Sequence, residues 1–451
     1  MKDSNFLKEN NARFGWHPMA HPGGMRKNPP RIVVESDGVD VIDIDGHRML
    51  DAVGGLWNVS LGHSAPAVKQ AMIDQIGRMP YYNAFRGTTH DRLIELSVAL
   101  TDFFAPEGMA RAFFTSGGSD SVETALRLAR QFHRLTGQPE RTKFFSLKKG
   151  YHGTHMGGAS VNGNANFRRN YEPMLSGTFH LPAPYAYRNP FGTADGAVIA
   201  QRIAETFEEE IAFQGADTIA ALIMEPVLGS GGVIVPHETL FPLMRRICDR
   251  HGILLIADEV ITGFGRAGAE SGSRLWGIRP DIMTTAKSLS NGFFPIGATL
   301  VSERIAEVFE ASDERGTISH GYTYSGHPVG AAAALATLAE VQRQGIVANA
   351  KLRGDELLAA LERLKTRHAI VGDVRGKGLM AALELVSDRS AKTPLGKGAM
   401  QVLFDTAYDA GVMLRTSGAN VIISPCLVVE SHHIDKIEQA LDKALSAATA
   451  A

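Results

Sequence analysis

Ile253-Leu-Leu-Ile-Ala-Asp258 and Ile282-Met-Thr-Thr-Ala-Lys287 are two apolar runs that each end in one charged residue. Continuous apolar runs of this length are typical of strands in a parallel sheet that helices cover on both faces. Ligands of such sheets bind outside the carboxyl ends of the strands, where Asp258 and Lys287 would both lie. Because a buried carboxylate and a buried amine are unfavourable without partners, the pair predicts a functional site at this edge of the sheet.

The chemistry of pyridoxal phosphate requires these two groups. A lysine amine forms a Schiff base with the aldehyde of the cofactor, and a carboxylate keeps the pyridine nitrogen protonated so that the ring accepts electrons. Lys287 and Asp258 would fill these two catalytic roles. Taken alone, Lys287 could be a surface lysine after a strand, and Asp258 could be the N-cap of a following helix.

Two longer segments carry a resemblance to a known family. Residues 258–266 (DEVITGFGR) and 287–297 (KSLSNGFFPIG) resemble the class III aminotransferases, which are pyridoxal-phosphate enzymes of fold type I. The resemblance extends from Trp16 to Pro425. It implies an α/β fold with a large domain, built on a mostly parallel sheet covered by helices, and a smaller α+β domain. The implied cofactor is pyridoxal 5'-phosphate, and the implied partners are a small amine donor and an oxo-acid acceptor.

The order of segments along the chain predicts how the two domains are built. We expect an N-terminal segment that joins the small domain, a large cofactor-binding domain and a C-terminal part of the small domain, at residues 1–60, 61–329 and 330–451. Prolines and histidines make helices unexpected in residues 1–30. Alternating runs around Asp37-Gly38 predict a hairpin, and the composition shifts to long amphipathic helices from about residue 330.

A glycine-rich turn follows the short predicted strand at 112–114 and enters an amphipathic helix. Backbone N–H groups at a helix N-terminus, together with the helix dipole, form a ready anion site. On this ground we assign Gly118 and Ser119 to the cofactor phosphate. A Gly-Ser turn before a helix is by itself more often structural, so this assignment depends on the neighbouring motifs.

Further cofactor contacts are expected where other strands end. Tyr151 and His152 follow the predicted strand at 143–147, where an aromatic ring can stack on the pyridine ring, and the family carries Tyr-His-Gly at this place. Glu225 ends the buried run at 218–224. We expect it to accept hydrogen bonds in the floor of the site rather than to react. Val260 would pack on the ring face opposite Tyr151.

The resemblance also implies residues for the substrate and for a second subunit. Trp57 would line the wall of the substrate pocket, although it could equally fill the junction between domains. Arg415 would bind a substrate carboxylate, for which the guanidinium fork is suited, with an exposed turn arginine as the alternative. Thr323 lies in a motif that the family places in the neighbouring subunit's site. A homodimer, or a dimer of dimers, with shared active sites is therefore expected.

The overall composition excludes other classes of protein. With 46 Lys and Arg residues against 48 Asp and Glu residues, the chain lacks the basic surface that nucleic acid or an anionic membrane attracts. The N-terminus has no apolar core of signal-peptide length, and the charge-free run at 321–339 is interpreted as a loop followed by a buried helix. We therefore expect a cytoplasmic protein.

Neither a disulfide nor a metal is expected. Cys248 and Cys426 lie far apart in apolar surroundings and are interpreted as buried free thiols, although the sequence alone leaves open whether they meet. His152 and His155 have the spacing of metal ligands, but no third ligand with helical placement stands nearby.

An NAD-dependent dehydrogenase is the alternative from another class of enzyme. Gly263-x-Gly265-x-x-Gly268 follows a strand and matches the dinucleotide fingerprint. The fingerprint requires a helix that opens at its third glycine, whereas residues 267–277 contain three glycines and show weak apolar periodicity. This context disfavours the dehydrogenase.

Two positions depart from the family branch that uses 4-aminobutyrate and 2-oxoglutarate. That branch has a glutamine where this chain has Ile261 and a glutamate where it has Ser230. We therefore expect an ω-amino acid or amine:pyruvate aminotransferase that works by ping-pong transamination. A 2-oxoglutarate-dependent ω-aminotransferase is the alternative within the fold, and decarboxylases or racemases of the same fold stay open.

Overall fold

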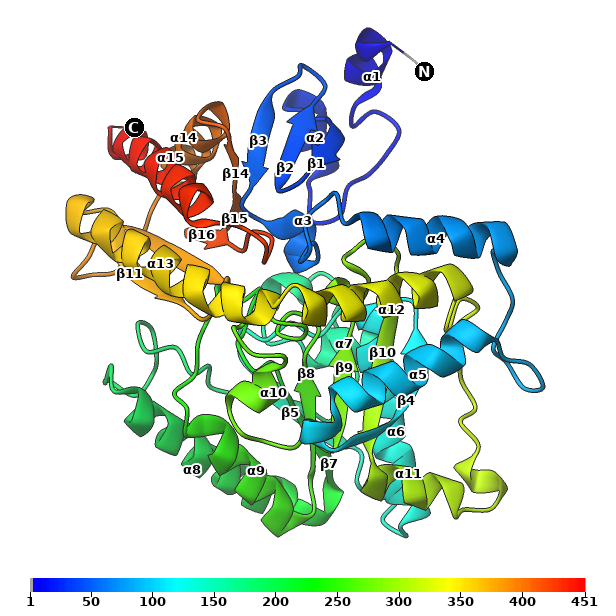
Figure 1. Ribbon diagram of the computed structural model, residues 1–451. Helices are drawn as coiled ribbons and strands as arrows, with labels where there is room; N and C mark the ends of the chain where they lie inside the picture. Colours follow the sequence, from blue (N-terminus) through cyan, green and yellow to red (C-terminus); the bar gives the residue numbers. More distant parts are fainter. Residues whose placement is uncertain (1–2, 451) are drawn as a thin grey trace.

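The computed structural model describes residues 3–450, which are organised around a seven-stranded sheet (Figure 1). The strand order is β4-β10-β9-β8-β7-β5-β6. Strand β10 is antiparallel to β4 and β9, and the pairs from β9 to β6 are parallel, so the predicted mostly parallel sheet is confirmed. The strands are β4 (Met109–Thr115), β5 (Lys143–Leu147), β6 (Thr178–Leu181), β7 (Ile219–Met224), β8 (Leu254–Asp258), β9 (Ile282–Thr285) and β10 (Gly297–Ser302).

Strands β8 and β9 are the two apolar runs that the sequence singles out, and every residue in both is buried. They are parallel neighbours, with Asp258 opposite Thr284. Lys287 follows β9 at the start of the short 3-10 helix η4 (Lys287–Ser290). The sheet therefore brings Asp258 and Lys287 to the same edge, as predicted.

Helices cover both faces of this sheet because alternate strand residues point to opposite sides. Ile256 packs in a cluster with Val122 of α6, whereas Leu255 packs in a cluster with Phe207 of α8. Figure 1 shows α8 and α9 on one side of the sheet. The helices of this part are α4 (Pro66–Arg78), α5 (Asp91–Phe103), α6 (Gly118–Leu135), α7 (Met156–Val161), α8 (Gly196–Gln214), α9 (Leu240–His251), α10 (Gly272–Leu275), α11 (Glu303–Glu310) and α12 (Pro328–Arg343).

Two smaller sheets contain the remaining strands. The first has the order β1-β2-β3-β14 and joins both ends of the chain, because β3 pairs in parallel with β14. Its strands are β1 (Val33–Asp37), β2 (Asp40–Asp43), β3 (Arg48–Asp51) and β14 (Val412–Met413), so the predicted hairpin at Asp37-Gly38 is confirmed. The second has the order β11-β12-β16-β15, with β13 paired to β12: β11 (Val371–Gly376), β12 (Ala381–Asp388), β13 (Thr393–Pro394), β15 (Arg415–Ser417) and β16 (Asn420–Ile423).

The C-terminal part contains the long helices expected from about residue 330, since α13 (Ile346–Arg367) follows α12. Two further helices were not predicted, α14 (Lys397–Asp409) and α15 (Ser431–Thr449), and α15 packs against both α13 and α14. Figure 1 shows α12 and α13 crossing the middle of the molecule between the large sheet and the elements from the two ends of the chain. The short helix α3 (Gly54–Trp57) follows β3 and precedes α4 in the chain. The domain limits at residues 60 and 329 stay predictions.

The expectation of no helix in residues 1–30 is wrong. Helices α1 (Ser4–Asn10) and α2 (Pro22–Lys27) both form there. The side chain of Asp3 caps α1 by accepting a hydrogen bond from the backbone N–H of Phe6. Proline is favourable in the first turn of a helix, where its missing N–H has no intrahelical partner, and this is the position of Pro22.

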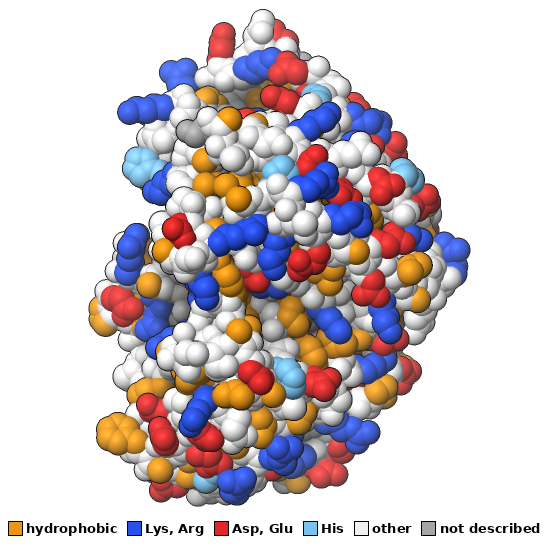
Figure 2. Space-filling model, turned by 90° about the vertical axis from the view of Figure 1, so that its left-hand side faces the viewer, with side chains coloured by type: hydrophobic (Ala, Val, Ile, Leu, Met, Phe, Trp, Pro, Cys, Tyr) orange, Lys and Arg blue, Asp and Glu red, His pale blue; other side chains and the backbone are white. Residues whose placement is uncertain are grey.

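Three further expectations concern the surface and the cysteines. Within residues 3–450, no helix combines the length and the apolar character needed to cross a membrane. Helix α12 begins only at Pro328, so the charge-free run is a loop followed by a helix, as predicted. Cys248 and Cys426 are both free and buried. On the face shown in Figure 2, basic and acidic side chains are interspersed.

Candidate active site

A cavity of about 450 Å³ lies at the carboxyl ends of the central strands. It brings together residues that are far apart in the sequence. Of the residues predicted for the site, eight line it: Gly118, Ser119, Tyr151, His152, Glu225, Asp258, Val260 and Lys287. The parallel strands β5, β7 and β8 place Tyr151, Glu225 and Asp258 at one edge, because each residue stands at or just beyond the end of its strand.

The Asp258 carboxylate is buried and held by several donors. Its Oδ2 lies 2.8 Å from Nδ1 of His152, and its Oδ1 accepts hydrogen bonds from the Val260 N–H at 3.2 Å and the Thr284 hydroxyl at 3.1 Å. The other ring nitrogen of His152 is buried without a hydrogen-bond partner in the described residues. The carboxylate is thereby fixed in orientation at the cavity, as a partner for a protonated ring nitrogen requires.

The Lys287 amine lies in the same cavity. Burial lowers the pKa of this amine, while the Asp258 and Glu225 carboxylates oppose the change and Arg415 adds to it. A lower pKa increases the fraction of neutral amine, which is the form that attacks an aldehyde. Lys287 has φ of 47°, a left-handed backbone conformation that is uncommon outside glycine and occurs at functional sites.

Glu225 forms part of the cavity floor. Its carboxylate accepts hydrogen bonds from the backbone N–H groups of Tyr151 at 2.9 Å and Gly229 at 3.0 Å, as predicted for a residue that orders the floor. Burial raises the pKa of Glu225 to about 7, and the nearby Asp258 carboxylate adds to this increase. Glu225 therefore ties the strand end that carries Tyr151 to the loop after β7.

The N-terminus of α6 opens onto the cavity. This helix begins at Gly118 without a side-chain cap, so its first N–H groups have no partner within the helix. A Cβ atom at Gly118 would lie 2.9 Å from Cγ1 of Val260, so only glycine leaves the space open. Unpartnered amides and the positive end of an eighteen-residue helix fit a phosphate group.

Three predicted residues lie outside the cavity lining. Trp57 is only 2% exposed and packs behind the wall in a cluster with Ile261, while its neighbour Asn58 lines the cavity. Thr323 is exposed, and its backbone carbonyl accepts a hydrogen bond from the Tyr81 hydroxyl at 2.7 Å. Arg415 is half-buried on β15, close enough to Tyr151 for the two side chains to influence each other.

One part of the cavity wall was not predicted from the sequence. Phe294, Pro295 and Ile296 line the cavity and follow the turn that carries Lys287. Their segment was recognised through its resemblance to the family. No periodicity or charge marks these three residues as wall residues, because their position depends on how the turn after η4 packs.

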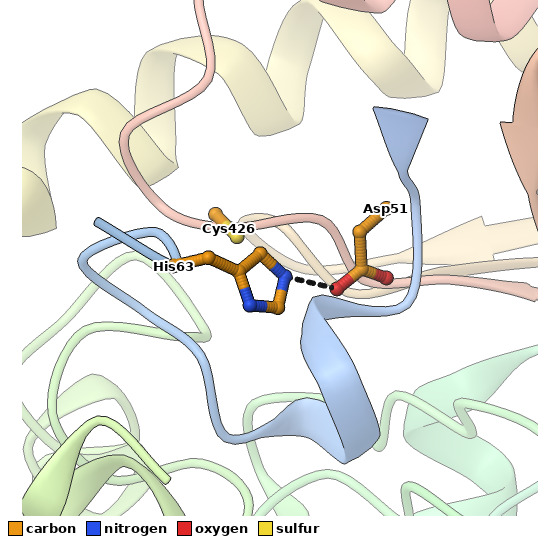
Figure 3. Close-up of side chains that lie close together, drawn as sticks. All are labelled: Asp51, His63 and Cys426. Atoms are coloured by element: carbon orange, nitrogen blue, oxygen red, sulfur yellow. Dashed lines mark hydrogen bonds and ion pairs between the residues drawn. The ribbon is translucent and has the colours of Figure 1, made fainter. Parts of the chain in front are cut away.

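The two histidines with metal-ligand spacing have different partners. His152 pairs with Asp258, and Nε2 of His155 lies 2.5 Å from Oδ1 of Asp120. Within residues 3–450, one group of three side chains could hold a metal ion, formed by Asp51, His63 and Cys426 (Figure 3). None of these three residues lines the cavity.

The dinucleotide fingerprint does not have its required context. Residues 263–268 lie in a series of turns, and the next helix, α10, begins at Gly272 and has four residues. The third glycine of the fingerprint, Gly268, therefore opens no helix, and the dehydrogenase alternative loses its support.

Comparison with known proteins places the chain in a family. The model of the class-III aminotransferases matches residues 24–445. The chain is 36% identical over 422 residues to the putrescine–pyruvate aminotransferase of Pseudomonas aeruginosa, covering 93% of this chain and 91% of the relative. It is also 36% identical over 368 residues to the diaminobutyrate–2-oxoglutarate transaminase of Halomonas elongata, covering 81% of this chain and 78% of the relative.

A solved structure shows the same fold. It is an amine transaminase from an uncultivated Pseudomonas species with pyridoxal phosphate bound, with a TM-score of 0.94 and 47% identity over 96% of this chain and 98% of that one. The strand-end carboxylate, the buried lysine and the helix N-terminus fit the cofactor of this family. The chain belongs to the class-III aminotransferases, which are pyridoxal-phosphate enzymes of fold type I.

Proposed function

We propose that this aminotransferase moves an amino group from an ω-amino acid or amine to pyruvate in a ping-pong reaction. The observation that carries the choice of acceptor is the half-buried Arg415 guanidinium, which lies close enough to Tyr151 and Lys287 of the cavity to act on their charges. Within residues 3–450, Arg415 forms no ion pair with an acidic residue, and the side chain that acts on its charge is that of Tyr151.

Different residues of the cavity would bind different parts of the cofactor. Bound pyridoxal phosphate supplies an electron sink for a carbanion at the substrate carbon. We infer that Asp258, oriented by His152, binds the ring nitrogen, and that the first amides of α6 at Gly118 and Ser119 bind the phosphate. Tyr151 and Val260, which both line the cavity, would pack against the two faces of the ring.

Lys287 is the residue that we propose to move protons. Its Nζ would take a proton from the substrate carbon as a general base and then, as a general acid, deliver it to the C4′ carbon of the bound cofactor rather than back to the substrate. Burial lowers the pKa of this amine and so brings it closer to the pH at which both steps are efficient. The turn that carries Lys287 is bonded to the N-terminal segment, since the Ser288 hydroxyl pairs with that of Ser60 at 2.8 Å.

Charge matching favours pyruvate as the acceptor. Arg375, the other arginine of the adjoining small sheet, already donates to Asp373 and to the carbonyl of Gly232. Arg415 is therefore the guanidinium left to bind a substrate carboxylate in the described chain, and pyruvate has one carboxylate whereas 2-oxoglutarate has two. One relative is named for pyruvate and the other for 2-oxoglutarate, and both are 36% identical to this chain. The choice of acceptor therefore depends on the charge argument.

The exposed position of Thr323 supports a shared site. This residue does not line the cavity of its own chain. Exposed aromatic side chains lie near it, since Tyr81 donates to its carbonyl, Tyr324 packs on Tyr81, and Phe85 approaches Gly321. Exposed apolar groups that gather on one surface are typical of protein interfaces. We infer that a second copy of the chain covers this surface and that Thr323 completes the phosphate site of that copy.

A half-reaction screen tests the proposed acceptor. The pyridoxamine form of the enzyme is mixed with pyruvate, 2-oxoglutarate, glyoxylate or succinic semialdehyde, and the return of the visible absorption band is followed. We expect the largest kcat/KM with pyruvate. A larger value with 2-oxoglutarate would favour the alternative ω-aminotransferase.

A further inference from the structure

The turn at residues 54–58 carries part of the cavity wall. Asn58 lines the cavity, and Leu56 is 51% exposed. The turn has an unusual backbone, because Gly54, Gly55 and Trp57 have φ values of 56°, 65° and 65°. A tryptophan seldom adopts a left-handed conformation, so the surrounding structure must hold this one in place.

The buried carboxylate of Asp51 holds the start of this turn. Its Oδ1 accepts a hydrogen bond from the Val53 N–H at 3.0 Å, and its Oδ2 accepts one from the Gly55 N–H at 2.7 Å. His63 approaches from the far end of the same segment, with Nε2 at 2.9 Å from Oδ2 of Asp51 (Figure 3). The pair therefore closes the base of the loop between residues 51 and 63.

The far part of this loop is bonded to the turn that carries Lys287. The Asn291 carboxamide accepts a hydrogen bond from the Leu61 N–H at 2.7 Å and donates one to the Gly62 carbonyl at 2.9 Å. The Ser288 hydroxyl lies 3.4 Å from the carbonyl of Trp57. A change in the 51–63 loop thus reaches the wall of the cavity.

The neighbouring thiol raises the question of a metal site, because Cys426 completes the group of possible ligands. One observation opposes a cation there. The buried guanidinium of Arg266, close enough to act on both Cys426 and Asp51, would repel a cation.

We propose that Asp51 and His63 are positioning residues that hold the Gly54–Asn58 turn and so set which amine donors fit the cavity. This inference rests on the proposed function. With asparagine at position 51, one of the two oxygen acceptors is lost. The N–H groups of Val53 and Gly55 then cannot both keep their partner, and the turn that presents Asn58 relaxes.

The test compares Asp51→Asn with a matched control, Asp43→Asn, in the holoenzyme. Asp43 is also a buried aspartate that holds a turn, since its Oδ1 accepts hydrogen bonds from the N–H groups of Asp45 and His47, both at 2.9 Å. It does not line the cavity. Stopped-flow half-reactions with a series of amines, from 2-aminobutane to 1-phenylethylamine, give kcat and KM for each donor.

We expect Asp51→Asn to change the ratio of kcat/KM between the bulky and the small donor by about tenfold, mainly through KM, which corresponds to about 1.4 kcal/mol. The visible band of the bound cofactor should stay. Asp43→Asn should lower the thermal midpoint without changing the ratio. Equal ratios in both variants would overturn the inference, whereas a wild-type enzyme that converts no amine would instead contradict the proposed function.

A second series covers the case in which Asp51→Asn does not fold. His63→Gln keeps a donor for Asp51, so its donor ratio should lie closer to the wild type than that of His63→Ala. Cys426→Ala should keep the wild-type ratio. Zinc at one equivalent in the wild type that is lost in Cys426→Ala would overturn the inference in favour of a metal site, as would equal ratios in the two His63 variants.

Discussion

Replacing Arg415 by alanine separates substrate recognition from a structural role. If the half-buried guanidinium binds the carboxylate of pyruvate, the variant loses charge-assisted hydrogen bonds that are worth about 1.5–3 kcal/mol. This free energy corresponds to a decrease in kcat/KM of roughly 10- to 150-fold. We expect at least a tenfold decrease with pyruvate, because a partly exposed pair gives the lower end of this range.

The assay uses one substrate as the control for the other. Stopped-flow absorbance follows the pyridoxamine form with pyruvate and, separately, the pyridoxal form with an arylalkylamine that has no carboxylate. The kcat/KM of the variant with the amine should stay within about twofold of the wild-type value, since an amine without a carboxylate makes no contact with the lost charge. The kcat/KM of Arg415→Lys with pyruvate should lie between the values of the wild type and of Arg415→Ala, because an ammonium keeps the charge without the planar fork. An equal decrease in both half-reactions would refute the recognition role and indicate a structural one.

Lys287→Ala should abolish turnover and leave a folded protein that binds the cofactor weakly, as absorbance and circular dichroism would show, and near-wild-type turnover would refute its role. Gly118→Ala should weaken cofactor retention during dialysis, since its Cβ would press on the stiff side chain of Val260, and unchanged retention would argue against the phosphate assignment. In the apoenzyme, burial raises the pKa of Glu225 from its ordinary value of 4.5 to about 7, so native Glu225 holds a proton that the unfolded chain has lost. Its contribution to the free energy of unfolding should therefore fall as the pH rises from about 4.5 to about 7. Urea titrations at several pH values should show this decrease in the wild type and not in Glu225→Gln. Mixing inactive Lys287→Ala subunits with weakened Thr323→Ala subunits should restore activity, because a mixed dimer contains one intact shared site, and no gain on mixing would contradict the shared site.

The strand-end residues could be found from the sequence because local patterns determine them. A run without charged residues that is mostly apolar is expected to be buried on both faces, so Asp258, Glu225 and Lys287 stand out where such runs end. The turn before α6 is also a local signal, since a glycine-rich segment ahead of an amphipathic helix is a candidate anion site. Its assignment to the cofactor phosphate depended in addition on the other motifs of the chain.

Helices in the first thirty residues were not predicted because the local signals for them are weak. The cap that Asp3 provides and the proline in the first turn of α2 are each favourable, yet the prolines and histidines of this segment made helices unexpected. Such short helices are marginal on their own, and contacts with the rest of the protein decide whether they form.

What the sequence by itself determined is the sheet, the order of its main elements and the chemical groups at its edge, because these follow from hydrophobic pattern and residue type. Only the tertiary structure decided how those groups are partnered. His152 meets Asp258 across 106 positions of sequence, Trp57 packs behind the cavity wall, and Arg415 lies near Tyr151 without an acidic partner among residues 3–450. Long-range packing brings such groups together, and the hydrogen bonds, burial and pKa values that define the site arise only from that packing.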